Sequence, residues 1–259
     1  MHKDLIILMY HGVIAGAATI VQARESGATL YDLAVEKFKA QMEYLKNNSY
    51  RVCKIDDLNN GKTKKDVVLT FDDGELSNSQ VALPILVQNN FPAYFFITTR
   101  RIGQQGYMGW KELMYLRDAG MVVGSHGLTH EILTTLNMQQ LKEELSDSKK
   151  ILEKELKIKV EYFSVPRGFY NEKIIQLAKE AGYKKIFVSD LNNDHEDYCI
   201  GRVAVKNFWS MSRFKVALDG EIPILELFFN FLKNPIKKFL GGKSYDRFRR
   251  ILLKEHRDF

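Results

Sequence analysis

The sequence predicts an α/β fold in which helices connect the strands of a mainly parallel sheet. Short apolar runs, one of them rich in β-branched residues, alternate with stretches whose apolar residues recur at helical spacing. Repeated strand-then-helix order requires crossover connections, which favours parallel strands in an open sheet or a barrel. In both arrangements functional side chains gather at the carboxyl ends of the strands. Polar clusters follow several of the expected strands here, which supports this interpretation.

The expected elements follow one another along most of the chain. Strands are expected at residues 5–10, 67–71, 93–97, 121–124, 162–165 and 183–188, and helices at 32–47, 79–89, 110–119 and 171–181. Gly120 and Gly182 follow two of these helices, as left-handed C-caps often do. A longer helix is predicted from one apolar face, formed by Leu141, Leu145, Ser148, Leu152 and Leu156.

Composition and charge suit one large domain with an appendage. The chain has 259 residues, of which 45% are hydrophobic, and we expect a catalytic domain at 1–220 and a C-terminal extension at 221–259. Two cysteines, Cys53 and Cys199, do not make a disulfide framework. Residues 231–257 carry nine basic and two acidic side chains, whereas the rest carries 29 basic and 30 acidic. Because the basic charge belongs to the tail, we expect no nucleic-acid partner.

The two ends of the chain bear on localisation. The apolar run at 5–10 is too short for a signal-peptide core or a membrane span, so we expect a cytoplasmic protein. The basic, amphipathic extension is expected to be helical, but Glu226, Lys233 and Pro235 interrupt it too often for a span. Three interpretations stay open for it: peripheral contact with the inner face of the membrane, packing on the barrel, or a dimer contact.

The first chemical motif is the segment 70–74, Thr-Phe-Asp-Asp-Gly, at the end of an expected strand. Two adjacent carboxylates raise the pKa of one of them unless a cation separates their roles. A metal bound by one aspartate would leave the other as a base. The alternative is an Asp-Asp-Gly turn between strand and helix.

The second motif is Ser-His-Gly-Leu-Thr-His at 125–130. His126 and His130 lie on one face if this segment is helical, and their spacing suits a divalent metal; a solvated loop is the alternative. Together the two motifs supply one aspartate and two histidines. Three ligands and an open position are typical of catalytic zinc, although other first-row metals also accept these ligands.

With a third segment, Phe-Ser-Val-Pro-Arg-Gly-Phe-Tyr-Asn-Glu at 163–172, these motifs resemble the polysaccharide deacetylases of carbohydrate esterase family 4, which share a NodB-like homology domain. The resemblance covers roughly residues 5–215. It implies a distorted (β/α)7 barrel, followed here by the helical appendage. It also implies Asp72 as general base and Asp73, His126 and His130 as ligands of Zn²⁺ or another divalent metal. The third motif would shape the substrate groove with Pro166, Arg167, Gly168, Phe169 and Tyr170, and the N–H of Phe169 or Tyr170 would stabilise the oxyanion.

The implied activity is hydrolysis of the N-acetyl group of an amino sugar, in a glycan or in a lipid- or nucleotide-linked precursor of a cell-surface polysaccharide. The alternatives are hydrolysis of another non-peptide amide bond on the same scaffold and a non-catalytic sugar-binding relative. Arg167 is expected either to bind a phosphate or carboxylate of the substrate or to pair with a rim acid such as Asp72.

The chain departs from the family where the general acid is usually found. The late Asp-Trp and Leu-x-x-His motifs are not evident, and only His195 and His256 follow the third motif. A branch of the family begins with Tyr-His at the end of the first strand, as Tyr10 and His11 do here. We therefore expect His11 to act as the general acid; the alternative is that it only helps to pack or orient the rim.

Overall fold

The computed structural model describes residues 5–16, 27–60, 65–189 and 198–220. The extension at 221–259, with the helix and membrane contact expected for it, lies outside these residues, as do His195 and His256. The domain boundary and the localisation therefore stay predictions. Among the helices of the described ranges, none is long and apolar enough to cross a membrane.

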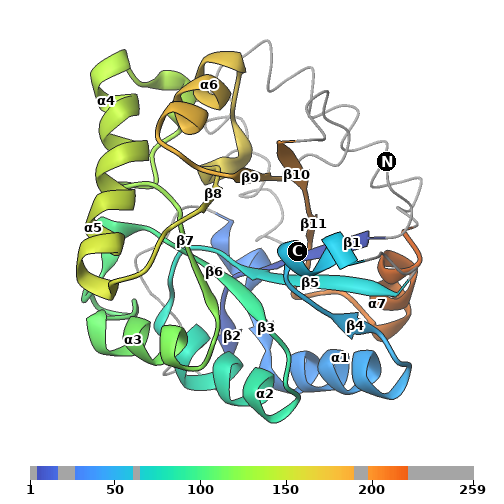
Figure 1. Ribbon diagram of the computed structural model, residues 1–259. Helices are drawn as coiled ribbons and strands as arrows, with labels where there is room; N and C mark the ends of the chain where they lie inside the picture. Colours follow the sequence, from blue (N-terminus) through green and yellow to red (C-terminus); the bar gives the residue numbers. More distant parts are fainter. Residues whose placement is uncertain (1–4, 17–26, 61–64, 190–197, 221–259) are drawn as a thin grey trace, which may run out of the picture.

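Short strands build the centre of the molecule. They are β1 (Leu5–Tyr10), β2 (Val13–Ile14), β3 (Leu33–Ala34), β4 (Arg51–Val52), β5 (Asp66–Phe71), β6 (Ala93–Ile97), β7 (Val122–Ser125), β8 (Tyr162–Ser164), β9 (Lys185–Val188), β10 (Cys199–Gly201) and β11 (Val203–Ala204). The main sheet has the order β10-β9-β8-β7-β6-β5-β1-β11, with β4 beside β5, while β2 and β3 pair separately (Figure 1). All pairings between these strands are parallel. The six expected strands are present, with ends shifted by at most two residues.

The sheet is nearly closed into a barrel, because its two edge strands are separated in the chain by Arg202 alone. β10 pairs with β9 at one edge, and β11 pairs with β1 at the other. The pairing is uneven: β1 and β5 pair over six residues, whereas β7 and β8 pair only through Ser125 and Phe163. The expected distorted α/β barrel is therefore confirmed. The two very short strands β10 and β11 bring the edges of its sheet together.

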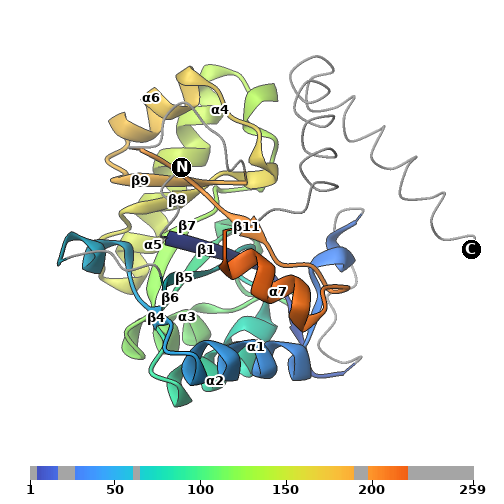
Figure 2. The same ribbon diagram turned by 90° about the vertical axis from the view of Figure 1, so that its right-hand side faces the viewer.

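Helices surround this sheet. They are α1 (Val35–Asn47), α2 (Leu83–Gln88), α3 (Trp110–Asp118), α4 (Met138–Lys142), α5 (Ser148–Leu156), α6 (Glu172–Glu180) and α7 (Met211–Leu218). In Figure 1, α4 and α5 lie to the left of the sheet, α6 above it, and α1 to α3 below it. Figure 2 shows α7 packed beside α1. Helix α1 begins at Val35 and not at residue 32, because Leu33 and Ala34 pair as β3.

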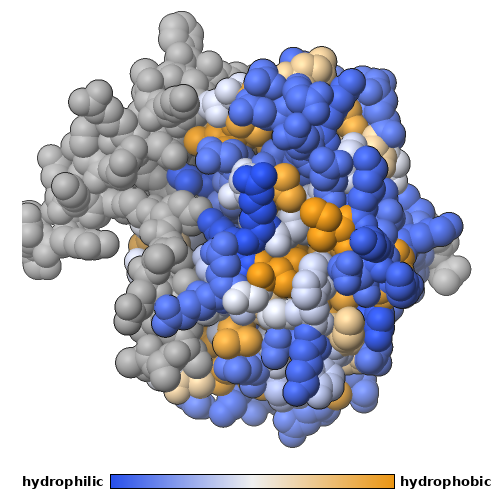
Figure 3. Space-filling view, turned by 90° about the vertical axis from the view of Figure 1, so that its left-hand side faces the viewer, coloured by the Kyte–Doolittle hydropathy of each residue, from blue (hydrophilic) through white to orange (hydrophobic). Residues whose placement is uncertain are grey.

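One long helical segment combines α4, the π-helical turn η7 (Glu143–Asp147) and α5. This is the long helix expected from the sequence, and its predicted inner face is buried, as shown by Leu141, Leu145, Ser148, Leu152 and Leu156. The surface over α3, α4 and α5 faces the viewer in Figure 3 and is mainly hydrophilic, with small separate apolar spots. The segment is thus amphipathic, with its apolar side toward the sheet.

The two faces of strand β5 have different chemistry. Leu69 and Phe71 belong to the core between the sheet and the helices, whereas Val68 belongs to a smaller cluster inside the barrel. Side chains two residues apart point to the same side of a strand, so Thr70 and Asp72 continue the row of Val68. The barrel interior is therefore apolar at one end and polar at the end where β5 finishes.

Candidate metal centre

The predicted site residues lie where neighbouring parallel strands end. His11 follows β1, Asp72 and Asp73 follow β5, and His126 follows β7. The third predicted motif follows β8, where Pro166 begins a short turn. Because these strands lie in the order β8-β7-β6-β5-β1, their carboxyl ends meet on one rim, as the sequence predicted.

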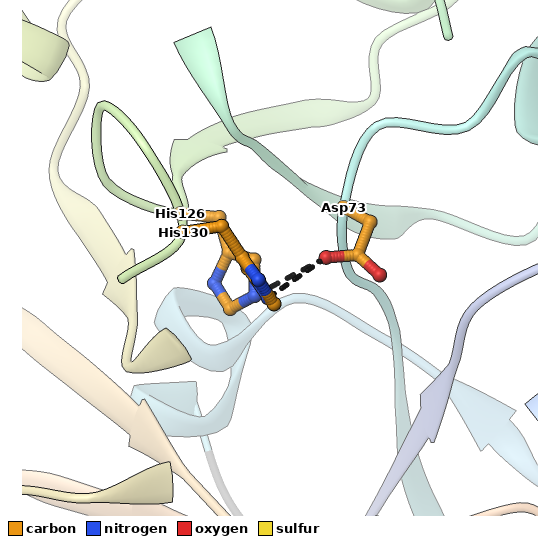
Figure 4. A group of neighbouring side chains, drawn as sticks. All are labelled: Asp73, His126 and His130. Atoms are coloured by element: carbon orange, nitrogen blue, oxygen red, sulfur yellow. Dashed lines mark ion pairs between the residues drawn. The ribbon is translucent and has the colours of Figure 1, made fainter. Parts of the chain in front are cut away.

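Three side chains on this rim converge as a candidate metal-binding group (Figure 4). One ligand atom from each of Asp73, His126 and His130 lies within 4.8 Å of the others. Oδ1 of Asp73 is 3.1 Å from Nε2 of His130 and 3.7 Å from Nε2 of His126. All three side chains are buried, at 2–7% exposure. One carboxylate and two imidazoles are a ligand set that zinc and other first-row metals accept.

The segment that carries both histidines is not helical, so the condition for a shared helix face is not met. Residues 126–130 form a loop, in which Gly127 has φ 79° and His130 has φ 70°. Asp73 also has a positive φ, 75°, so two of the three candidate ligands occupy a backbone region that side-chain-bearing residues rarely adopt. The ligands converge because of local turns, and such strain is typical of functional sites.

The orientation of His126 is fixed by a hydrogen bond on its far side. Its Nδ1 lies 2.8 Å from the carbonyl oxygen of Ser164, which directs the other nitrogen, Nε2, toward Asp73. A ligand histidine commonly donates its second N–H to a carbonyl in this way. Burial lowers the pKa of His126 to about 4, so the ring is neutral at pH 7 and able to bind a metal.

Asp73 is charged despite its burial. Burial alone would raise its pKa, but the charge and hydrogen bond of His130, with smaller effects of His11 and His126, hold it well below the ordinary value. Arg101 adds a further cation that the sequence analysis missed: its Nη1 lies 3.3 Å from Oδ1 of Asp73, and its guanidinium stacks over Tyr107. The two consecutive arginines that follow β6 after Thr98 and Thr99 were the available signal.

Asp72 lies next to this group but is held by different partners. Its two oxygens each accept a hydrogen bond of 2.8 Å from the guanidinium of Arg202, and Oδ2 also accepts one from the hydroxyl of Ser164 at 3.1 Å. Oδ2 is 4.0 Å from Nε2 of His126. Burial raises the pKa of Asp72, but the charges of Arg202 and His126 outweigh it and lower the pKa. Asp72 is therefore an ionised carboxylate beside the candidate ligands.

Arg202 is the main residue that the sequence analysis missed. It is 2% exposed, it joins β10 to β11, and it also donates to the hydroxyls of Thr70 and Ser164. Its guanidinium lies over the rings of Phe96 and Phe187 inside the barrel. A single charged residue in the otherwise apolar run 199–205 was the signal for it. From the sequence, Arg167 was considered as a partner of Asp72. Both oxygens of Asp72 accept from the guanidinium of Arg202 instead.

His11 lies at the same rim with an uncommitted ring nitrogen. Its Nδ1 is buried and has no hydrogen-bond partner among the described residues, and its ring stacks on Tyr31 at 4.7 Å. Burial lowers the pKa of His11, while the charges of Asp73 and Asp72 act in the opposite direction. These carboxylates are close enough to influence the ring, but its role as an acid stays a prediction.

The third motif forms a tight turn beside the histidine loop. The turn η8 (Pro166–Gly168) contains Arg167 at φ 61° and Gly168 at φ 72°. Pro166 lies so close to Gly127 that a Cβ added to this glycine would be 3.6 Å from Cγ of the proline. Phe169 is 7% exposed and Tyr170 packs partly against the core. The structure thus brings the turn to the metal-binding group, while substrate binding by its five residues stays a prediction.

Comparison with known sequences identifies the family. The sequence model of the family described as polysaccharide deacetylase matches residues 59–186, which include Asp72, Asp73, His126 and His130. The chain belongs to the polysaccharide deacetylase family. YxkH of Bacillus subtilis, named as a polysaccharide deacetylase, is 29% identical over 225 residues, which cover 83% of this chain and 76% of YxkH.

Other relatives agree with this membership. The peptidoglycan-N-acetylmuramic acid deacetylase PdaA of Bacillus subtilis is 30% identical over 135 residues, and the match spans 50% of this chain and about half, 49%, of PdaA. The structure of the Streptococcus pyogenes deacetylase PplD superimposes with a TM-score of 0.71 at 23% identity, over 83% of this chain and 97% of PplD. The chain thus has the same fold as PplD.

Proposed function

We propose that this protein is a metal-dependent hydrolase that removes the N-acetyl group from an amino sugar in a glycan or a glycan precursor. One observation supports the proposal above all: Asp73, His126 and His130 converge, with the separately held carboxylate of Asp72 directly beside them. Such an arrangement can bind a divalent metal and still keep a base. The name of PdaA refers to N-acetylmuramic acid in peptidoglycan and that of YxkH to a polysaccharide, and both support this substrate class.

Asp73, His126 and His130 would hold the metal, for which we propose Zn²⁺. Their chemistry fits, because His126 is neutral and oriented through Nδ1, and Asp73 is ionised. When bound, a divalent metal polarises the acetyl carbonyl and lowers the pKa of water.

Asp72 would act as the general base. Arg202 and Ser164 hold its carboxylate in one orientation, so that it needs no rearrangement before it accepts the proton of the attacking water. Its lowered pKa keeps it in the proton-accepting form at neutral pH. The same hydrogen bonds occupy both oxygens of Asp72, which favours its role as a base over that of a fourth protein ligand.

His11 would supply the proton that the leaving amine requires. Its Nδ1 has no hydrogen-bond partner among the described residues and could therefore bond to the substrate. Stacking on Tyr31 limits rotation of the ring. Burial lowers the pKa of His11, whereas the charges of Asp73 and Asp72 favour the imidazolium, and it is this protonated form that would donate to the amine. The backbone N–H of Phe169 or Tyr170 would stabilise the oxyanion, and Arg167 would bind an anionic group of the substrate.

The direct test is acetate release from N-acetylated sugars of three kinds: β-linked N-acetylglucosamine oligomers, lipid-linked sugars and nucleotide-linked sugars. We expect release from at least one kind, complete loss on treatment with a strong chelator, and recovery when Zn²⁺ is added back. Metal content measured by elemental analysis should be one ion per chain. A protein that takes up zinc but releases no acetate from any of these compounds would contradict the proposed reaction.

A further inference from the structure

The loop between the two candidate histidine ligands is held by hydrogen bonds on both sides. On one side, the carbonyls of Gly127 and Leu128 accept from the backbone N–H groups of Thr99 and Arg100, which follow β6. On the other side, the N–H groups of Leu128 and Thr129 both point to one carboxylate, that of Glu144. The backbone of residues 127–129, between the two ligands, is therefore held by two neighbouring elements.

Glu144 makes an unusually complete set of contacts for a buried acid. It is 3% exposed, and it accepts from N of Leu128 at 2.7 Å, from N of Thr129 at 3.1 Å and from the hydroxyl of Thr129. A buried carboxylate is stable only when such donors replace its water. A Cβ on Gly127 would lie 2.6 Å from Oε2 of Glu144, so only glycine allows this close approach.

The π-helical turn η7 places Glu144 at this loop. Ser148, four residues later, contacts the hydroxyl of Ser125 at 2.8 Å, and Ser125 in turn accepts the N–H of Gly127 at 3.2 Å. A π turn leaves backbone groups to be satisfied from outside, and here the hydroxyl of Tyr183 donates to the carbonyl of Leu145 at 2.8 Å. Such turns in helices are frequent at functional sites. Two side chains of one helix thus contact the start and the middle of the ligand loop.

We propose that Glu144 is a positioning residue of the metal centre, which holds the loop between His126 and His130 so that both imidazoles keep the spacing required by the metal ion. This inference rests on the proposed metal-dependent function. Glu144 touches no ligand atom. It would contribute to the metal affinity through its hydrogen bonds to the backbone between the two histidines. The loop is then arranged before the metal binds, which saves the cost of ordering it.

The test compares three variants by their affinity for Zn²⁺, measured in competition with a chelator. Glu144→Gln keeps the size of the side chain but replaces one acceptor oxygen with an amide that faces N–H donors. We expect it to raise the dissociation constant about 10- to 100-fold, as loss of outer contacts does at other metal sites. Thr129→Val keeps the charge of Glu144 and removes one hydrogen bond, so we expect about a 2- to 5-fold rise. Glu143→Gln changes the neighbouring carboxylate, which contacts Gln139 on the surface, and should leave the affinity unchanged.

A second readout separates positioning from a general loss of stability. The visible absorption of bound Co²⁺ reports the arrangement of the ligands, so it should change in Glu144→Gln but not in Glu143→Gln. A purely structural role would lower the unfolding temperature of the metal-free protein and leave both the cobalt spectrum and the zinc affinity as in the wild type. That result in Glu144→Gln and Thr129→Val would overturn the inference.

The outcomes also distinguish this inference from the proposed function. If the wild type binds zinc and Glu144→Gln binds it equally well, the positioning role is refuted and the proposed function stands. If the wild type takes up no metal, the proposed function fails, and the positioning role with it. If Glu144→Gln does not fold, Thr129→Val decides, because its isosteric change removes only one hydroxyl.

Discussion

Asp72 and Asp73 are neighbours in the chain with opposite surroundings. The oxygens of Asp72 accept two hydrogen bonds from Arg202 and one from Ser164, on the inner side of the barrel. Asp73 has a left-handed backbone and lies against two imidazoles. The carboxylate of Asp72 is enclosed by hydrogen-bond donors of the protein. The carboxylate of Asp73 faces two imidazoles that can also bind a metal.

This difference shows how two adjacent carboxylates can both be ionised in a buried place. Like charges so close would normally raise the pKa of one of them. Here both pKa values are lowered, because a guanidinium compensates Asp72 and histidines compensate Asp73. The alternating direction of β5 and the positive φ of Asp73 separate the two side chains, so each acquires its own set of partners.

The largest effect should come from exchanging each carboxylate for an amide. Asp72→Asn should lower kcat by about 10³- to 10⁴-fold, the upper range for loss of a general base, while one zinc per chain is retained. Asp73→Asn should lose both activity and stoichiometric zinc, because an amide is a poor zinc ligand. Acetate release and elemental analysis on the same samples measure the two properties together.

Asp118→Asn is the matched control, since Asp118 is an exposed acid paired with Arg117 on the surface. It should keep both activity and zinc. If Asp72→Asn lost zinc as Asp73→Asn does, the division between base and ligand would be wrong.

Removing the partner of Asp72 should be the largest change in stability. Arg202→Met fits the space beside Phe96 and Phe187 but leaves Asp72 charged and without its guanidinium. Breaking a buried ion pair in this way costs about 3–5 kcal/mol in the free energy of unfolding. Urea unfolding of the metal-free protein at pH 7 measures it.

The double variant Asp72→Asn with Arg202→Met is the control for this second prediction. It should recover part of the lost stability, because no uncompensated charge remains. If the losses of the two single variants simply added, Arg202 would act through its packing and not through Asp72.

The comparison also shows what the sequence contained. Asp72, Asp73, His126 and His130 were recognisable because each lies within a short motif at the end of an apolar strand, so the α/β barrel and the candidate ligands followed from local patterns. Whether the two histidines lie on a helix or in a loop stayed open, because the loop geometry depends on Glu144 and on turns at Gly127 and His130. Spacing along the chain does not contain that information.

Arg202 illustrates a different limit. It lies 130 residues from Asp72 in the chain, and only closure of the barrel between β10 and β11 brings them together. Two- and three-residue strands leave almost no periodic signal, so their pairing is not visible in the sequence. A single arginine within an apolar run is a sign of burial, but its partner is set by topology.

Lowering the pH should reduce the stability of the metal-free protein through protonation of His126, at pH values above those at which Asp72 and Asp73 are protonated. The pKa of His126 is about 4 in the folded protein and 6.5 in an unperturbed chain, so the unfolded state binds more protons between these values. The contribution of His126 to the free energy of unfolding is therefore fully present above pH 6.5. It is lost as the pH drops toward 4, by at most about 3 kcal/mol. The lowered pKa values of Asp72 and Asp73 act in the same direction at still lower pH. Thermal unfolding in chelator across this range measures the slope, and a wild-type slope in His126→Asn would contradict the assignment.

The smallest expected effect concerns the proton donor, and it tests whether the rim supplies a separate acid beside the two aspartates. His11→Gln should lower kcat on an N-acetylated sugar about 100-fold, because the amine leaves poorly without a proton. On p-nitrophenyl acetate, whose leaving group needs no proton, the same variant should keep nearly the wild-type rate and its zinc. Tyr31→Phe, which keeps the stacked ring beside His11, serves as the control and should change neither rate. Equal losses of His11→Gln on both substrates would show that His11 only orients the rim, and a donor would then have to come from the substrate or from another part of the chain.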